Sequence, residues 1–333
     1  MVGAALRDVA MEQYRRQQVI ARRAANRVQT VWQQIDRARI SESWQQLSPL
    51  LVGAVVDAQT EAAKLADPYL DDVLDVEDAD PAAAGRVNPG AFAGIASDGR
   101  PLVSLLYQPV IDWKVRMLAG QSMEDAFRGS LANALRITST QVADAGRGAT
   151  GVAMASRRTI QGYVRVVSPP ACARCIILAG KEFGWNKGFQ RHPRCDCIHL
   201  PTTLIAHNQN RRGYLDPDDY FRGLSRTEQD RIFGAAGARA IRDGGDMAQI
   251  VNARRGMYTA DAYGQQLAAT REGATRRGLF YRQERRRALD RGQVANARDF
   301  QLRTPRLMPE EIYRLADSRD EALAMLRRFG YLT

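Results

Sequence analysis

Lysine, histidine and cysteine are scarce in this chain of 333 residues, which contains 44 Arg but 4 Lys, 3 His and 4 Cys. Long apolar runs are also lacking, since the longest, residues 50–56, is far shorter than the roughly 20 residues of a membrane-spanning helix. The first ten residues lack the basic start and apolar stretch of a secretion signal. We therefore expect no membrane association and synthesis in a reducing cytoplasm, where paired cysteines bind metal more often than they form disulfides.

The scarcity of histidine limits the catalytic chemistry that the chain could support. The histidines are His192, His199 and His207, and neither a G-x-S-x-G nor an H-E-x-x-H string occurs. A serine protease needs a serine, a histidine and an acid brought together in space, and a cysteine protease would take its nucleophile from the few cysteines. Because a constellation assembled in space leaves no mark on the sequence, a protease stays open as an alternative, but we predict no catalytic residue.

All four cysteines lie between residues 171 and 201, in two tight pairs. Cys172 and Cys175 form a C-x-x-C pair, and after sixteen further residues His192 opens the segment His-Pro-Arg-Cys-Asp-Cys, which contains Cys195 and Cys197. Two such hairpins joined by a loop of this length are typical of a structural Zn²⁺ site, whose tetrahedral shell takes one ligand pair from each side. A closed shell leaves no position for water, so this site would be structural and not catalytic.

Five candidate ligands compete for four positions around the metal. Thiolates bind zinc strongly, which favours a site of four cysteines, with His192 as an outer hydrogen-bond donor or turn residue. His192 could instead replace Cys195 or Cys197, because the one-residue separation of these two is tight for simultaneous ligation. A disulfide between the hairpins after assembly, or unpaired buried thiols, are the alternatives to zinc.

The net charge of +11 is concentrated in the second half of the chain. Residues 1–150 carry 16 Lys and Arg against 18 Asp and Glu, whereas residues 151–333 carry 32 against 19. The densest stretch, residues 271–306, contains eleven Arg, and such a strip attracts nucleic-acid phosphates without reading base sequence. A solvated helical face is the alternative. The predicted DNA-binding residues are Arg276, Arg277, Arg282, Arg285, Arg286, Arg287 and Arg291.

The apolar pattern predicts a mostly α-helical chain with long N-terminal helices. Apolar residues recur every three or four positions from Ile20 to Ile35, as they do on one face of a helix. A second helix is expected to begin at Pro49, because proline is favoured at the first helical position. Further helix starts are predicted at Ser122, at about Ser139, and at Pro217, Ser225, Pro309 and Ser318.

The periodicity changes from helical to alternating around the cysteines. Residues 162–167 alternate as a strand does, and residues 197–201 are a candidate partner strand. The cysteine pairs thus lie at the ends of two strands, and a metal there would fix a sheet that is too short to be stable alone. We predict a mostly α fold with a small α+β core stapled by zinc and a basic, helical C-terminal region.

Composition divides the chain into four regions. Residues 1–70 are expected to form an N-terminal helical arm, and residues 71–100 an exposed linker, because an acidic run there leads into Pro-rich and Gly-rich segments. The acidic run could instead form a catalytic or cation site. Residues 101–206 would form the core that contains the cysteines, and residues 207–333 the arginine-rich, mostly helical region.

Several of these motifs occur together in an order that resembles the Mu F-like family of phage minor head proteins. A helical run and a strand are followed by the Cys172 pair, by Gly180-Lys181-Glu182-Phe183, and by the hexapeptide that closes at Cys197. This resemblance covers roughly residues 101–203. The arginine-rich tail, with residues 251–256 and 327–332, resembles the versions found in phages of actinobacteria.

The resemblance implies a virion component, assembled in the host cytoplasm and carried in few copies inside the head. Its implied partners are the portal protein, the scaffold or major capsid protein, and packaged double-stranded DNA bound without sequence specificity. Some related phage genes are labelled capsid maturation protease, so an enzyme that cleaves scaffold or capsid protein is the alternative to a head morphogenesis protein. A cellular zinc-bearing nucleic-acid protein is a third reading, but it would need a recognition helix, and the sequence indicates none.

Overall fold

The computed structural model describes residues 2–168, 170–186, 197–203, 216–262 and 264–332. They fall into two compact units, of which the first comprises residues 1–169 and 179–214, and the second residues 170–178 and 215–333. The short segment 170–178, which contains the first cysteine pair, therefore belongs to the second unit, although the chain on both sides of it belongs to the first. Within the described part of the chain, no helix is long and apolar enough to span a bilayer.

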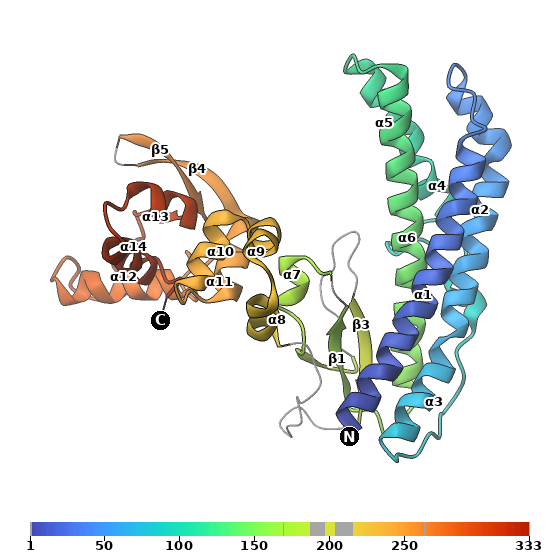
Figure 1. The fold of residues 1–333 in the computed structure, drawn as a ribbon, viewed down its shortest axis with the longest axis horizontal. Helices are drawn as coiled ribbons and strands as arrows, with labels where there is room; N and C mark the ends of the chain where they lie inside the picture. The colour runs from blue at the N-terminus through green and yellow to red at the C-terminus, as the bar shows by residue number, and fades with distance from the viewer. Residues whose placement is uncertain (1, 169, 187–196, 204–215, 263, 333) are drawn as a thin grey trace. The chain divides into compact units, whose positions relative to one another are not determined.

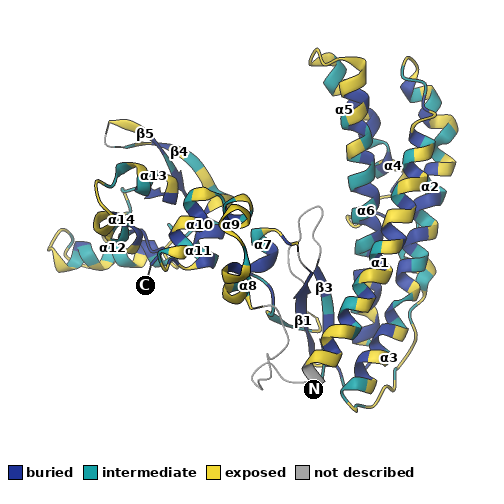
Figure 2. Ribbon diagram, viewed as in Figure 1, coloured by how far each residue is buried: buried dark blue, intermediate teal, exposed yellow. Residues whose placement is uncertain are grey.

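The first unit is built on three long helices that pack against one another, α1 (Val2–Trp32), α2 (Ile40–Lys64) and α6 (Met123–Ala155) (Figure 1). The apolar stripe predicted from Ile20 to Ile35 faces the bundle core, where Val28 and Trp32 are each 1% exposed. Fully burying a large apolar side chain contributes about 1.5–3 kcal/mol, so this face holds the bundle together (Figure 2). The long N-terminal helices are confirmed.

The second helix begins earlier than predicted, because α2 starts at Ile40 and Pro49 lies inside it. Proline has no amide hydrogen to donate to the carbonyl four residues earlier, which here belongs to Gln45. The hydroxyl of Ser48 donates to this carbonyl at 3.1 Å and replaces the missing hydrogen bond. Ile40 and Trp44 are buried in the bundle core, and their packing extends the helix beyond the predicted start.

The two helices predicted after Ser122 form one continuous helix, α6. Its start is as predicted, since the Ser122 hydroxyl accepts a hydrogen bond from the amide of Asp125 at 3.1 Å. Glycines in its second half weaken intrinsic helix propensity, but packing against α1 and α2 compensates. At Gly146 a Cβ would lie 2.8 Å from the amide nitrogen of the flexible Gln17 side chain, so a larger residue there would displace this side chain of α1.

Shorter elements pack on the same bundle. α3 (Ala66–Val76) buries Leu70, Val73 and Leu74, so the first part of the acidic stretch is helical. Residues 1–70, expected to form an arm, lie in the same unit as residues 101–169. The remaining helical elements of this unit are η1 (Pro89–Phe92), α4 (Leu102–Leu106) and α5 (Gln108–Leu118).

A three-stranded antiparallel sheet of order β2-β1-β3 completes the first unit. β1 (Gly162–Val167) and β3 (Cys197–Thr202) match the two predicted strands and pair from Gly162 opposite Thr202 to Val167 opposite Cys197. β2 (Glu182–Gly184) was not predicted, because three residues are too few to show a periodicity. Helices α1, α3 and α6 contact β3, which gives the mostly helical unit its small α+β core.

The second unit combines short helices with a sheet of order β4-β5-β6, in which neighbouring strands are antiparallel. The sequence predicted mostly helix in this region and missed the sheet, because its strands contain few β-branched or aromatic residues. Four predicted helix starts are confirmed, at Pro217, Ser225, Pro309 and Ser318. The elements are α7 (Ala173–Ile176), α8 (Pro217–Gly223), α9 (Arg226–Phe233), α10 (Ala235–Arg242), α11 (Met247–Ala253), η2 (Arg254–Gly256), β4 (Met257–Ala262), β5 (Gln265–Thr270), α12 (Leu279–Asp290), β6 (Arg306–Leu307), α13 (Pro309–Leu315) and α14 (Arg319–Arg328).

Candidate functional site

The predicted metal ligands are distributed over both units. Cys172 is exposed at the N-cap of α7 and Cys175 is buried within this helix, and both belong to the second unit. Cys197 is buried at the first residue of β3 in the first unit, where its carbonyl accepts a hydrogen bond from Nε of Arg147 at 3.0 Å. His192 and Cys195 lie outside the described residues.

Among the residues that the structure describes, no group of three or more His, Cys, Asp or Glu side chains is arranged to hold a metal ion. Two of the five candidate ligands lie outside this part of the chain, so the zinc site remains a prediction from sequence. His199 belongs to the packing of the sheet, since its ring stacks on Tyr163 with the centroids 4.2 Å apart and its carbonyl accepts from the Tyr69 hydroxyl at 2.9 Å. His207, like His192, is not among the described residues.

The densest part of the arginine strip forms α12, a helix with one buried and one exposed face. Phe280 and Ala288 are buried and anchor the helix to the second unit. Arg282 and Arg286 lie one turn apart on the exposed face, and Arg285, between them, is half-buried. A surface that contacts DNA and a face that only contacts water would both expose guanidinium groups. The exposure of these arginines is therefore compatible with either interpretation.

The other predicted DNA-binding residues divide into two groups. Arg276 and Arg277 are exposed in the segment that leads into α12. Arg287 instead pairs with Glu284, with Nη1 2.9 Å from the carboxylate, and Arg291 follows the last helical residue. Arg287 and Arg291 both line a cavity. The seven residues therefore differ in their surroundings.

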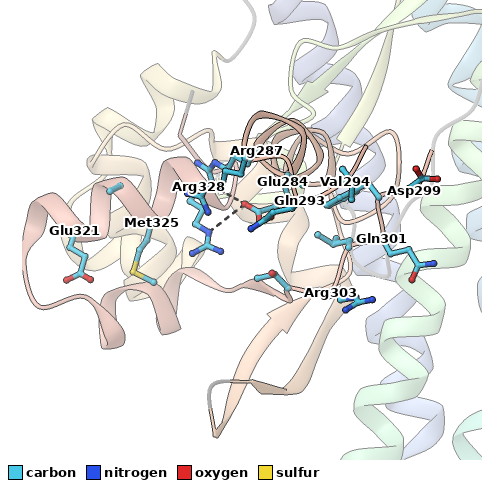
Figure 3. Close-up of a pocket in the computed structure, with 16 residues that line it drawn as sticks. Glu284, Arg287, Gln293, Val294, Asp299, Gln301, Arg303, Glu321, Met325 and Arg328 are labelled. Carbon is cyan, nitrogen blue, oxygen red and sulfur yellow. Dashed lines mark hydrogen bonds and ion pairs between the residues drawn. The ribbon is translucent and has the colours of Figure 1, made fainter. Parts of the chain in front are cut away.

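That cavity, of about 760 Å³, lies between α12, α14 and residues 291–304 (Figure 3). Glu284 lines the cavity, and one of its carboxylate oxygens is 2.9 Å from Arg287 Nη1 and 3.6 Å from Arg328 Nε. The Glu284 side chain is 12% exposed. This cavity could not be predicted from the sequence, because its lining comes from three separate segments.

The acidic run contributes to a buried ion-pair cluster in the first unit. The Arg157 side chain is fully buried, with its nitrogens 3.0 Å from Asp67 Oδ1 and 2.6 Å from Asp71 Oδ1. Arg86 also donates to Asp71, at 2.8 Å. Burial raises the pKa of Asp71, but hydrogen bonds from Arg86 and Arg157 outweigh it, and the pKa lies below its ordinary value. These two carboxylates therefore neutralise a buried guanidinium.

One helix of the first unit exposes an apolar stripe. Ile111, Val115 and Leu118 of α5 are 40%, 57% and 89% exposed, and their spacing places them on one face. Val110 and Trp113 are buried and hold the helix against the bundle (Figure 2). A contiguous exposed apolar face of this kind is typical of a surface that binds another protein.

Comparison with known proteins identifies the family of this chain. A family model described as VG15 protein matches residues 6–224, about two thirds of the chain. The match spans the helical bundle and its sheet and ends just after α8, so it does not include α12 or the cavity beside it. Searches of curated proteins and of solved structures found no match.

Proposed function

The chain belongs to the VG15 protein family, a phage-associated family, and we propose that it is a minor head protein of the phage virion. The family match supports a phage origin, and the minor head role rests on the Mu F-like order of motifs in residues 101–203, which lie within the matched range. Few copies inside the head, beside the portal protein and the scaffold or major capsid protein, are expected from that resemblance. The capsid maturation protease alternative gains no support from the described residues, where His199 packs in a sheet.

Contact with packaged DNA is the second part of the proposal. It is supported by the charge of the second half of the chain and by the exposed face of α12, where Arg282 and Arg286 can reach phosphates one turn apart. Arg276 and Arg277, exposed in the segment before α12, would add further phosphate contacts. Such contacts are electrostatic and independent of base sequence, as DNA packaged in a head requires.

Salt dependence tests the DNA contact. The full chain should bind duplex DNA with an affinity that falls steeply with salt, and Arg282→Gln with Arg286→Gln should lower the slope of log affinity against log salt by about 2, since each phosphate contact contributes about 0.9. The measurement is fluorescence anisotropy between roughly 50 and 200 mM salt. A matched control, Arg226→Gln with Arg231→Gln on α9, removes two exposed arginines of the same unit and should change the slope little. A flat salt response of the unaltered chain would contradict the DNA contact.

Attachment to the portal protein needs a surface that folding leaves uncovered. We propose the α5 stripe of Ile111, Val115 and Leu118 for this contact, because these apolar side chains are exposed on one helical face. Burying these side chains in a protein contact would remove exposed apolar surface from water. The first unit would then contact the portal protein, and the second unit would contact DNA.

A structural zinc ion bound by the cysteine pairs also belongs to the proposal. The purified full chain, kept reduced, should contain about one zinc ion, and Cys172→Ser should lose most of it because a ligand is removed. Zinc is measured by elemental analysis together with a thiol count. Ala173→Ser, inside the same C-x-x-C segment, is the matched control and should retain the metal. Folded, reduced protein without zinc would refute the site, and thiols lost in pairs would indicate a disulfide.

A further inference from the structure

The cavity between α12, α14 and residues 291–304 gathers more positive charge than its carboxylates neutralise. Four arginines line it, Arg287, Arg291, Arg303 and Arg328. Glu284 engages two of them, with one carboxylate oxygen facing both Arg287 and Arg328 (Figure 3). Within the described part of the chain, no carboxylate forms an ion pair with the other two, Arg291 and Arg303.

Two further carboxylates line the cavity, and within the described residues neither forms an ion pair with its arginines. Glu321 accepts a hydrogen bond from the backbone amide of Asp317 at 2.8 Å, so it is engaged at the start of α14. Asp299 is exposed, and Figure 3 shows it on the opposite side of the view from Glu321. An anion that enters the cavity would therefore meet Arg291 and Arg303 as its free partners.

The other side chains that line the cavity suit a ligand with a flat apolar ring and polar groups at its edge. Leu302, Val294 and Met325 provide apolar surface, while Gln293 and Gln301 provide amide donors and acceptors. The volume of about 760 Å³ lies within the range of small-molecule sites, roughly 300–1,000 Å³. The segment 291–304 has no helix or strand, and connections of this length in compact domains are commonly functional.

We propose that this cavity binds a nucleotide. Its phosphate would pair with Arg291 and Arg303, and its base would lie against Leu302 and Met325 with Gln301 at its polar edge. Glu284 is a positioning residue, because it orients Arg287 and Arg328 and keeps them from repelling each other. The site lies apart from the exposed face of α12 and does not depend on the DNA contact proposed above. The nucleotide could be free or the end of a DNA strand, since both present the same chemistry.

Calorimetric titration of the full chain with three probes tests this proposal. The probes are dAMP, inorganic phosphate and a 5′-phosphorylated single-stranded tetranucleotide. We expect dAMP to bind more tightly than phosphate, and Arg291→Gln and Arg303→Gln each to weaken dAMP binding about tenfold, because each removes a charge-assisted hydrogen bond. A tetranucleotide that binds at least about tenfold more tightly than dAMP would identify a strand end as the ligand, and equal affinity would identify a free nucleotide.

Two controls keep the result interpretable. Arg291 and Arg303 are exposed, so their variants should keep the thermal unfolding curve of the unaltered chain. Arg282→Gln with Arg286→Gln, on the exposed face of α12, should weaken duplex binding but leave dAMP affinity unchanged, which separates failure of this site from failure of the DNA contact. The proposal is wrong if dAMP does not bind at millimolar concentration, if it binds no more tightly than phosphate, or if Arg291→Gln and Arg303→Gln leave its affinity unchanged.

Discussion

Arg306→Met is expected to lower the free energy of unfolding of the second unit by about 3–5 kcal/mol. Arg306 is 1% exposed and donates to the carbonyls of Phe329 and Glu272 at 2.8 Å and of Gly330 at 3.2 Å. Its guanidinium also lies 4.2 Å from the centroid of the Tyr331 ring. Methionine would leave three carbonyls without their donor, and a buried unsatisfied polar group costs about 1–3 kcal/mol. A loss of this size is a large part of the stability of a domain, about 5–15 kcal/mol in total.

Denaturant unfolding with amide exchange resolved by segment measures this effect. Exchange should accelerate in β5, β6 and α14, while α1, α2 and α6 keep their protection. Arg298→Met, at an exposed position of the same unit, is the matched control and should change stability little. Arg306→Lys should recover part of the loss, because an ammonium group cannot reach all the acceptors that the planar guanidinium serves. Unchanged stability of Arg306→Met would show that the carbonyls find other donors.

Arg157→Met is expected to destabilise the first unit by about 3 kcal/mol. The Arg157 side chain is fully buried and links the end of α6 to Asp67 and Asp71 of α3. Removing one partner of a buried ion pair costs about 3–5 kcal/mol, and the lower value applies because the Asp71 side chain is 38% exposed. Arg158→Met, the adjacent and exposed position, should leave the unfolding midpoint nearly unchanged. Equal stability of the two variants would contradict a role for the buried pair.

The same cluster predicts an acid dependence of stability. The pKa of Asp71 is lowered in the folded chain, so the unfolded state binds protons more readily than the folded state as the pH falls. Asp71 therefore makes its full contribution to the free energy of unfolding above its unfolded pKa of about 3.9. This contribution is lost as the pH falls through the lower pKa of the folded state. In Arg157→Met this acid-induced loss should be smaller, because one of the hydrogen bonds that lower the pKa is gone. Urea unfolding between about pH 5 and pH 2.5 measures the difference.

Features that depend on neighbours in sequence were predicted well. The helix starts at Ser122, Ser225 and Ser318 follow from side chains that cap the amides of their own first turn. β1 was predicted from its alternation and β3 as its partner strand, and the helical stripe from Ile20 to Ile35 was predicted from its period. The start of α2 was missed for two reasons. The Ser48 hydroxyl donates to the carbonyl that Pro49 cannot bond, and packing in the bundle core extends the helix to Ile40.

The arginines separate what the sequence determined from what the tertiary structure decided. The sequence alone established a mostly helical chain with a basic second half and clustered cysteines, because composition and period are local properties. The sequence could not show that Arg282 lies on an exposed face, Arg303 at a cavity and Arg306 in the interior. All three are arginines of the same stretch, residues 271–306. That distinction arises when α12, α14 and β6 come together. A guanidinium is stable in the interior where carbonyls surround it, and those of Phe329 and Gly330 reach Arg306 from more than twenty residues away in the sequence.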